Sequence, residues 1–397
     1  MSSKKTQKNS NNEKAKMTTR TVCPYCNSEK FVKRGVRQKK YEKVQLYLCM
    51  ADNCGRTFTA ERVKGKRFPI NVIIEGISYY NLGLTLEQTC DFLAKKFSNT
   101  KNFLAPLPAT LSSWIEEYKP LCRFERMRPW AVKMFTPQHM IEVTTMVHRQ
   151  LYRFRYHRAK TILIMEEFKN RHFGRLKEYL DRVSSETPHQ YFDDGARMSE
   201  IRSKFDKTDM IVRSKSNFAN DLAEFVLSGV VDNKARHEAL QRFMIANDSV
   251  TVATEVPVYI RREDVEHMEN ELKFKITNNG QIELKGDKQE QKFPKLLTGH
   301  IDFVQIRNGM IHIMDYKPNA SKEKPIEQLT WYALALSRLT GLRLYEFKCA
   351  WFDDKDFYEF YPLHIVKKLR AGKRAKRIHY RDGTVVVVPN KNRLVVA

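Results

Sequence analysis

A tight hairpin is predicted at residues 307–310, which read Arg-Asn-Gly-Met. Asn-Gly suits the two positive φ values of a type I′ turn, so we expect a two-residue loop between two antiparallel strands. In that register the numbers of opposed residues sum to 617. Asp302 then falls directly opposite Asp315, on the same face of the sheet.

The two opposed carboxylates predict a site for a divalent cation. Cross-strand neighbours have Cβ atoms ~4.5 to 5.5 Å apart, where two like charges repel unless a cation or a proton lies between them. The alternation of side chains along a strand places Lys317 on the same face as Asp315 and opposite His300. Mg²⁺ binds carboxylates together with water and phosphate oxygen, and a neighbouring lysine can orient the attacking water. The alternative is an exposed hairpin whose charges are solvated.

Helix and strand signals alternate from residue 234 onward. We expect helices at 234–245 and 325–341, strands at 249–260, 296–306, 310–316 and 344–352, and an exposed hairpin insertion at 261–295. This order of elements resembles the αβββαβ core of the PD-(D/E)XK nucleases, in particular their RecB-like type.

The resemblance extends to short motifs. In that family Gly-x-x-Asp on one strand and Asp-x-Lys on the next form the active site, and the chain has Gly-His-Ile-Asp ending at Asp302 and Asp-Tyr-Lys from Asp315 to Lys317. The resemblance implies that both aspartates hold Mg²⁺ or Mn²⁺ and that the lysine assists the water. A histidine on the preceding helix completes the metal ligands in the family, and His237 fits that place. A solvated helix histidine is the alternative.

The family also carries Gln-x-x-x-Tyr on the following helix, which Gln328 and Tyr332 match. Residues four apart share one helix face, so we expect both to take part in the active site by positioning the substrate or the lysine. The alternative for Tyr332 is packing in the core. His300 and Glu255 receive no role.

Four of the seven cysteines form two tight pairs, which predict a structural zinc site made of Cys23, Cys26, Cys49 and Cys54. Four thiolates can surround Zn²⁺ in a tetrahedron and leave no open position for catalysis. The polar segment between the pairs is too poor in apolar residues to fold alone, so metal would supply most of its stability. Unrelated free thiols are the alternative. The quartet, with the run Cys-Gly-Arg-Thr-Phe that starts at Cys54, resembles the zinc ribbon of insertion-sequence transposases.

Three helices are predicted between residues 70 and 124, the last of them beginning at Pro108. They resemble the helix-turn-helix of the same transposases. By that resemblance 108–120 is the recognition helix, and the residues expected to contact DNA are Thr110, Ser112, Ser113 and Trp114. A plain helical bundle is the alternative.

The charge of the chain indicates an anionic partner. Lys and Arg number 71 against 46 Asp and Glu, a net charge of +25, and residues 1–68 hold 18 basic and 5 acidic residues, or +13. Such a field attracts polyphosphates, so we expect DNA as partner. No apolar run approaches the ~20 residues of a membrane span, which argues against a membrane partner. We expect a cytoplasmic, nucleoid-associated protein. The sequence does not indicate the oligomeric state.

Together these patterns predict an α+β multidomain protein. Its expected segments are a disordered basic tail (1–20), a zinc ribbon (21–68), a helix-turn-helix region (69–124), a helical connector (125–232), an αβββαβ restriction-endonuclease-like core (233–365) and a basic C-terminal arm with a short strand (366–397).

The expected function is a deoxyribonuclease that hydrolyses phosphodiester bonds with Mg²⁺ or Mn²⁺, carries a structural Zn²⁺ and is targeted by its N-terminal DNA-binding module. One alternative is a transposon-derived DNA-binding protein or regulator whose nuclease core is inactive. Another is a transposase with its carboxylates elsewhere, although residues 125–232 offer no convincing set.

Overall fold

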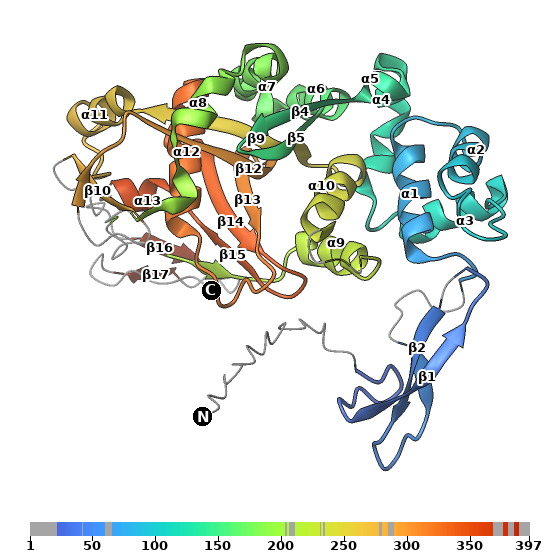
Figure 1. Ribbon diagram of the computed structural model, residues 1–397. Helices are drawn as coiled ribbons and strands as arrows, with labels where there is room; N and C mark the ends of the chain where they lie inside the picture. Colours follow the sequence, from blue (N-terminus) through green and yellow to red (C-terminus); the bar gives the residue numbers. More distant parts are fainter. Residues whose placement is uncertain are drawn as a thin grey trace, which may run out of the picture.

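The protein is an α+β chain built around a mixed nine-stranded sheet (Figure 1). The computed structural model describes residues 22–41, 43–59, 66–202, 205, 211–230, 232, 235–277, 280–284, 290–367, 376–379 and 385–388. The predicted disordered tail at 1–20 and most of the basic C-terminal arm lie outside the described residues. Within the arm, two strands pair as an antiparallel hairpin, β16 (Lys376–His379) and β17 (Val385–Val388).

The four-cysteine segment forms a small antiparallel sheet of its own. Its strands are β1 (Phe31–Gln38), β2 (Lys43–Cys49) and β3 (Thr57–Thr59). Phe31, Tyr47 and Phe58 pack against one another beside the cysteines. This core is small, and β1 is exposed along nearly its whole length.

Three helices follow, close to their predicted positions. They are α1 (Ile70–Asn81), α2 (Leu86–Lys96) and α3 (Pro108–Tyr118). A capping box opens α2, because Thr85 accepts from the backbone of Gln88 while the Gln88 side chain accepts from the backbone of Thr85. Residues 97–107 connect α2 to α3, a longer connection than the 3–4 residues typical of a helix-turn-helix.

Residues 125–232 do not form only a helical connector. The helices and 3-10 turns of this region are η1 (Arg123–Arg126), α4 (Arg128–Met134), α5 (Pro137–Met140), α6 (Arg158–Glu166), η2 (Phe168–Phe173), α7 (Gly174–Glu186), α8 (His189–Asp194), η3 (Met198–Glu200) and α9 (Phe218–Leu227). Its strands are β4 (Ile141–His148), β5 (Gln150–His157), β6 (Ala196–Arg197), β7 (Ile201–Arg202) and β8 (Arg213–Ser214). The hairpin β4–β5 joins the central sheet beside β9, so the prediction of a helical segment was wrong there.

From residue 235 the elements follow the predicted order. The structure has α10 (Arg236–Asn247), β9 (Thr251–Arg261), α11 (Arg262–Asn270), β10 (Gln281–Leu284), β11 (Glu290–Lys292), β12 (Leu296–Arg307), β13 (Met310–Tyr316), α12 (Ile326–Thr340), η5 (Leu344–Glu346), β14 (Phe347–Phe352), β15 (Phe357–Phe360) and α13 (Leu363–Val366). The insertion at 261–295 contains the expected hairpin, β10–β11, preceded by the helix α11.

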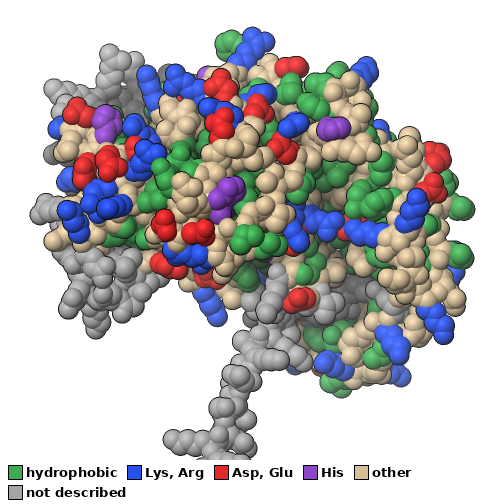
Figure 2. All heavy atoms as spheres, turned by 45° about the horizontal axis from the view of Figure 1, so that its top comes forward, with side chains coloured by type: hydrophobic (Ala, Val, Ile, Leu, Met, Phe, Trp, Pro, Cys, Tyr) green, Lys and Arg blue, Asp and Glu red, His purple; other side chains and the backbone are tan. Residues whose placement is uncertain are grey.

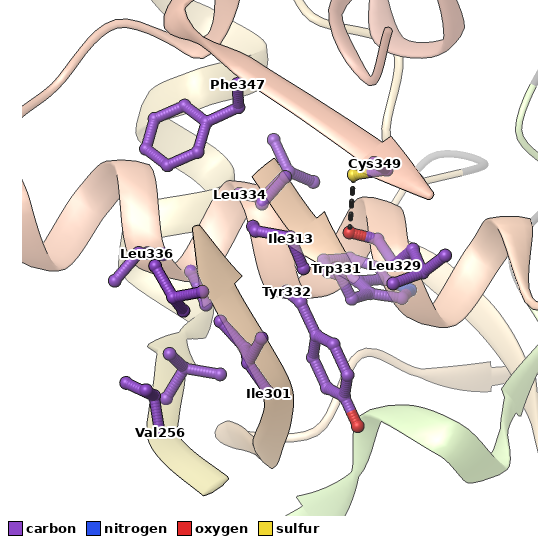
Figure 3. Close-up of a cluster of buried hydrophobic side chains, with 14 of the residues drawn as sticks. Val256, Ile301, Ile313, Leu329, Trp331, Tyr332, Leu334, Leu336, Phe347 and Cys349 are labelled. Carbon is purple, nitrogen blue, oxygen red and sulfur yellow. Dashed lines mark hydrogen bonds between the residues drawn. The ribbon is translucent and has the colours of Figure 1, made fainter. Parts of the chain in front are cut away.

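The central sheet runs in the order β4-β5-β9-β12-β13-β14-β15-β8, with β6 paired to β12. The pairs β13–β14 and β6–β12 are parallel and the others antiparallel. Two large hydrophobic clusters hold helices to this sheet. One includes side chains of α7 and α12, and Figure 3 shows Ile301 and Ile313 of the strands packed beside Leu334 and Leu336 of α12.

The second cluster joins the sheet to α9, α10 and the three-helix unit. Phe225 of α9 and Phe243 of α10 lie in it together with Ile73 of α1 and Leu111 of α3. On the sheet side the cluster includes Phe303. The three-helix unit and the sheet therefore share one hydrophobic core.

Basic and acidic side chains are interspersed over the face in Figure 2. No helix among the described residues combines the length and apolarity that a membrane crossing requires.

Candidate active site

The predicted hairpin has the expected turn and register. Asn308 and Gly309 have φ values of 54° and 70°, and the paired residues run from Arg307 with Met310 to Phe303 with Met314, each pair summing to 617. The backbone pairing ends there, one position short of Asp302. On its other edge β13 stays paired with β14 as far as Tyr316 with Phe352.

Asp302 and His300 lie beyond the end of this ladder, and their side chains have partners other than those the register predicted. Asp302 Oδ2 accepts a hydrogen bond from the backbone N–H of Tyr316 at 3.2 Å. His300 pairs with Pro257 of β9, and its side chain contacts His148 rather than Lys317. The prediction that His300 lies opposite Lys317 was therefore wrong.

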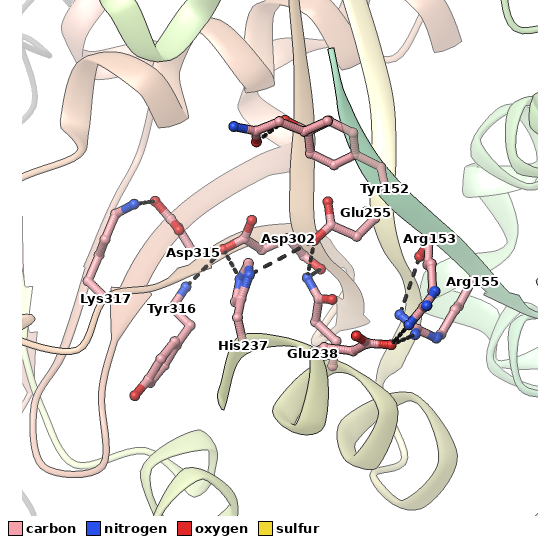
Figure 4. A network of polar contacts seen from close by, with 12 residues as sticks. Tyr152, Arg153, Arg155, His237, Glu238, Glu255, Asp302, Asp315, Tyr316 and Lys317 are labelled. Atoms are coloured by element: carbon pink, nitrogen blue, oxygen red, sulfur yellow. Dashed lines mark hydrogen bonds and ion pairs between the residues drawn. The ribbon is translucent and has the colours of Figure 1, made fainter. Parts of the chain in front are cut away.

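His237 of α10 reaches Asp302, as the motif predicted. Its Nε2 lies 2.7 Å from Asp302 Oδ2, and its Nδ1 lies 4.0 Å from Glu255 Oε1 (Figure 4). Glu255 is held by Gln241, also of α10, whose Nε2 donates to Oε1 at 2.6 Å. The side-chain ligand atoms of His237, Glu255 and Asp302 all lie within 4.8 Å of one another.

Charge coupling sets the protonation of this cluster. Burial alone would lower the pKa of His237, but the Asp302 carboxylate raises that pKa to about 9. Burial would raise the pKa of Asp302, yet the His237 charge and hydrogen bond hold it below its usual range. Burial, and then the charge of Asp302, raises the pKa of Glu255 to about 7. Without a metal, the Asp302 carboxylate therefore favours the charged form of the histidine, and burial beside Asp302 favours the protonated form of Glu255.

Asp315 and Lys317 form the adjoining part of the site. Lys317 Nζ lies 2.9 Å from Asp315 Oδ2, and Asp315 is 2% exposed. Burial and the charge of Asp302 raise the pKa of Asp315 well above its usual range. Burial would lower the pKa of Lys317, but Asp315 and Asp302 raise it. Figure 4 shows Lys317, Asp315, Asp302 and Glu255 side by side across the strands β13, β12 and β9.

Gln328 and Tyr332 contact each other on α12, with Gln328 Nε2 donating to the Tyr332 hydroxyl at 2.8 Å. The Tyr332 ring is 5% exposed and packs on Gly299, where a Cβ would approach its Cε1 to 2.4 Å. The glycine of the Gly-x-x-Asp motif is therefore the position that admits this ring. Tyr332 both packs in the core and lines a pocket beside the cluster.

A pocket of about 310 Å³ opens beside the cluster. Its wall includes the metal-ligand candidates, the Gln328–Tyr332 pair and residues of β5, β6 and β12. The lining residues are His148, Gln150, Tyr152, Phe192, Arg197, Ser199, His237, Glu255, Thr298, Gly299, His300, Asp302, Gln328 and Tyr332. Its volume is at the lower end of the range of ~300 to 1,000 Å³ common for ligand pockets. The site therefore combines a cluster of acidic and imidazole ligands with room for part of a substrate.

Glu255 is the site residue that sequence reasoning left unassigned. In the pairing of β9 with β12, Val256 is opposite Ile301 and Thr254 opposite Phe303, so Glu255 comes beside Asp302. Its φ of 51° interrupts the regular strand. The one signal in the sequence was that Glu255 is the single acidic residue of this strand.

The site can hold a divalent cation through oxygen and imidazole ligands. His237, Glu255 and Asp302 are the close group, whereas the prediction combined His237 and Asp302 with Asp315. Asp315 lies next to Asp302 and is engaged by Lys317. Carboxylates suit Mg²⁺ and Mn²⁺, and a bound dication would replace the positive charge that the histidine now supplies to Asp302.

The four N-terminal cysteines form a separate cluster that is compatible with a structural zinc. Their Sγ atoms lie within 4.8 Å of one another, with Cys23 and Cys54 3.6 Å apart and Cys26 and Cys49 3.5 Å apart. A tetrahedron with Zn–S bonds of ~2.3 Å has sulfur–sulfur edges of ~3.8 Å, close to these distances.

The residues predicted to contact DNA differ in exposure. Ser112 and Ser113 are exposed on α3 and Thr110 is partly exposed. Trp114 is 3% exposed, and its ring packs edge-on against Phe68 at 5.3 Å. Trp114 is therefore a core residue of the three-helix unit, which corrects the prediction that it contacts DNA.

Comparison of the chain with models of known protein families, with curated proteins and with solved structures found no match.

Proposed function

We propose that the protein is a metal-dependent DNA nuclease that hydrolyses phosphodiester bonds. The observation that carries the proposal is the convergence of His237, Glu255 and Asp302 beside a pocket, with Asp315 and Lys317 adjoining them. Such a group can bind a divalent cation and present a water and a phosphate oxygen to it. The succession α10, β9, β12, β13, α12, β14 supports the proposal, because it is the order of the αβββαβ core that the motifs resemble.

In the proposed reaction His237, Glu255 and Asp302 would hold Mg²⁺ or Mn²⁺, and Asp315 would be a further carboxyl group beside them. When bound there, the metal would neutralise charge in the phosphoryl transition state and lower the pKa of a water. Lys317 orients that water and donates to the developing charge. Gln328 and Tyr332 position the substrate from α12.

DNA docking is assigned to the N-terminal segments. The ribbon strand β1 carries Lys33, Arg34 and Arg37 on an exposed stretch, and α3 offers Ser112 and Ser113 to solvent. Phosphate contacts from basic side chains supply most of non-specific affinity for DNA, whereas groove contacts supply sequence preference.

The test is cleavage of labelled linear and supercoiled DNA with Mg²⁺, with Mn²⁺ and with EDTA. Asp302→Asn and Lys317→Met are expected to slow cleavage at least about 100-fold, because each removes a group that stabilises the transition state. Lys177→Met is the matched control, because Lys177 lies in a lysine–aspartate pair of 2.6 Å on α7, outside the pocket. It should cut at the wild-type rate.

Two results would overturn the assignment. Wild-type cleavage by Lys317→Met would show that the hairpin does no chemistry. DNA binding without cleavage under either cation would favour the alternative of a DNA-binding protein or regulator with an inactive core.

A further inference from the structure

We infer that Arg197 binds a phosphate of the nucleic acid next to the one that is cut, and that Tyr152 positions it. The inference rests on the proposed function and extends it to the far end of the pocket. Arg197 is the one lysine or arginine side chain among the described residues that line this pocket.

The strand β6 fixes the place of Arg197. It pairs in parallel with β12, where Arg197 lies beside Thr298 and Ala196 beside Leu297. This approach depends on Gly195, because a Cβ there would come within 2.8 Å of Thr298 Cγ2 and 2.6 Å of the Tyr191 carbonyl oxygen. The β6 segment can therefore lie close to β12, the strand that carries Asp302.

The pleat of β12 sets the distance between the two ends of the pocket. Thr298, His300 and Asp302 alternate along one face of the strand, and all three line the pocket. Four residues of strand span ~13 Å, so the backbone of Arg197 lies about that far from the backbone of Asp302. The side chain carries the guanidinium from there to the Tyr152 hydroxyl, in the same pocket as Asp302, where it can meet a phosphate beside the one at the cluster.

Polar contacts hold the guanidinium at the pocket. Arg197 Nη2 donates to the Tyr152 hydroxyl at 2.6 Å, and the Nη1 atom is 4.0 Å from the exposed carboxylate of Glu200. Tyr152 is itself fixed, because its ring stacks on His300 with centroids 3.6 Å apart and planes 7° from parallel.

A chain of histidines supports this wall of the pocket. His300 Nε2 lies 2.9 Å from His148 Nδ1, and His148 Nε2 lies 2.9 Å from His189 Nδ1. His148 also stacks on Phe192, with centroids 4.1 Å apart. The chain runs from the pocket to the exposed His189 and fixes the ring on which Tyr152 rests. Guanidinium groups bind phosphate through paired N–H donors, which favours a phosphate as the ligand of a guanidinium held in this way.

The first test measures DNA binding in a Lys317→Met background, where cleavage does not interfere. Arg197→Gln should weaken the affinity for a labelled oligonucleotide duplex about 10- to 100-fold, as expected for one charge-assisted contact. The slope of log affinity against log salt should fall by about 0.9, or about 0.7 for a single strand. Arg261→Gln is the control, because Arg261 also donates to a tyrosine hydroxyl, that of Tyr191 at 3.1 Å, but lies outside the pocket.

The second test uses the enzyme with Lys317 intact and asks how Tyr152 acts. Arg197→Gln should raise KM about 10- to 100-fold with little change in kcat, and Arg197→Lys should recover part of the loss. Tyr152→Phe keeps the ring on His300 and should raise KM less. In the Arg197→Gln background it should have no further effect, because Tyr152 acts through that arginine.

An unchanged KM and salt slope in Arg197→Gln, in a chain that cuts DNA, would overturn this inference alone. Additive effects of the two substitutions would overturn the positioning role of Tyr152. A wild-type chain that neither binds nor cuts DNA would refute the proposed function and this inference with it.

Discussion

Replacing Glu255 with Gln should remove much of the pH dependence of stability that the acidic cluster imposes. The carboxylate lies in the same group as Asp302, and its protonation reduces the repulsion between the two. Gln has nearly the same size and keeps an oxygen that can accept the 2.6 Å hydrogen bond from Gln241. The substitution therefore changes the charge and little else.

The size of the effect follows from the pKa of Glu255, which burial and the Asp302 charge raise from 4.5 to about 7. One pKa unit corresponds to ~1.4 kcal/mol, so the ionised carboxylate costs the folded state about 3 kcal/mol. Because the folded pKa is the higher one, this stability is fully present below pH 4.5 and is lost as the pH rises through 7. Of the total, about 2 kcal/mol is lost between about pH 5.5 and 8.5.

The assay is urea unfolding followed by tryptophan fluorescence, in EDTA, at about pH 5.5, 7 and 8.5. Glu255→Gln should be the more stable protein at the highest pH, and the advantage should shrink toward the lowest. In a separate set of samples without EDTA, Mn²⁺ added at the highest pH should stabilise the wild type more than the variant, because the variant lacks one ligand. Glu186→Gln, at an exposed position on α7, should follow the wild type. Parallel curves for wild type and Glu255→Gln would refute the electrostatic reasoning.

Two further predictions concern other parts of the chain. Elemental analysis of the purified protein should find about one zinc, and the double variant Cys26→Ser, Cys49→Ser should lose it, since two of four thiolates cannot complete a tetrahedron; full metal retention would contradict this. Gly299→Ala should destabilise the fold by ~1 to 3 kcal/mol in thermal unfolding, because its Cβ would come within 2.4 Å of the Tyr332 ring. Gly174→Ala, where nothing lies within 4 Å of the added Cβ, should not, and equal losses in both variants would argue against that ring position.

Turn and helix-end residues predicted the hairpin β12–β13 and the end of α12, where the structure depends on residues that are adjacent in sequence. The Asn308–Gly309 turn set the register of β12 and β13, because both residues have the positive φ that the dipeptide favours. The end of α12 was likewise marked by Gly341, which has a φ of 66°. In both cases the residues that define the structure are adjacent in sequence.

The hairpin β4–β5 was missed because its turn depends on distant contacts. Arg149 occupies the turn with a φ of 58°. Glycine and asparagine favour this conformation, but neither occurs at this turn, so the sequence does not indicate it. The Arg149 guanidinium donates to the carbonyl oxygens of Asp193 at 2.6 Å and Gly195 at 3.1 Å. Those partners lie more than 40 residues along the chain, so no local pattern reveals the turn.

The candidate site was predicted to the extent that it lies on one hairpin and its flanking helices. The pairing of His237 with Asp302 followed from the motif, and the structure brings the two within 2.7 Å. The position of Glu255 beside Asp302 could not be predicted, because residues 262–295 separate β9 from β12 and leave the register of these two strands undetermined by the sequence. A carboxylate can be placed beside another only when the turn between their strands fixes the pairing.

The core shared by the three-helix unit and the sheet limits how this protein can be taken apart or recombined. Tyr118, at the end of α3, packs against Phe225 of α9, and Asn81 of α1 donates to Asn247 of α10. A truncation that removes α1 to α3 would expose this apolar face to water and favour aggregation. The unit is thus not an interchangeable module, and a chimaera with a different helical unit in its place would have to carry the matching faces of α9 and α10 with it.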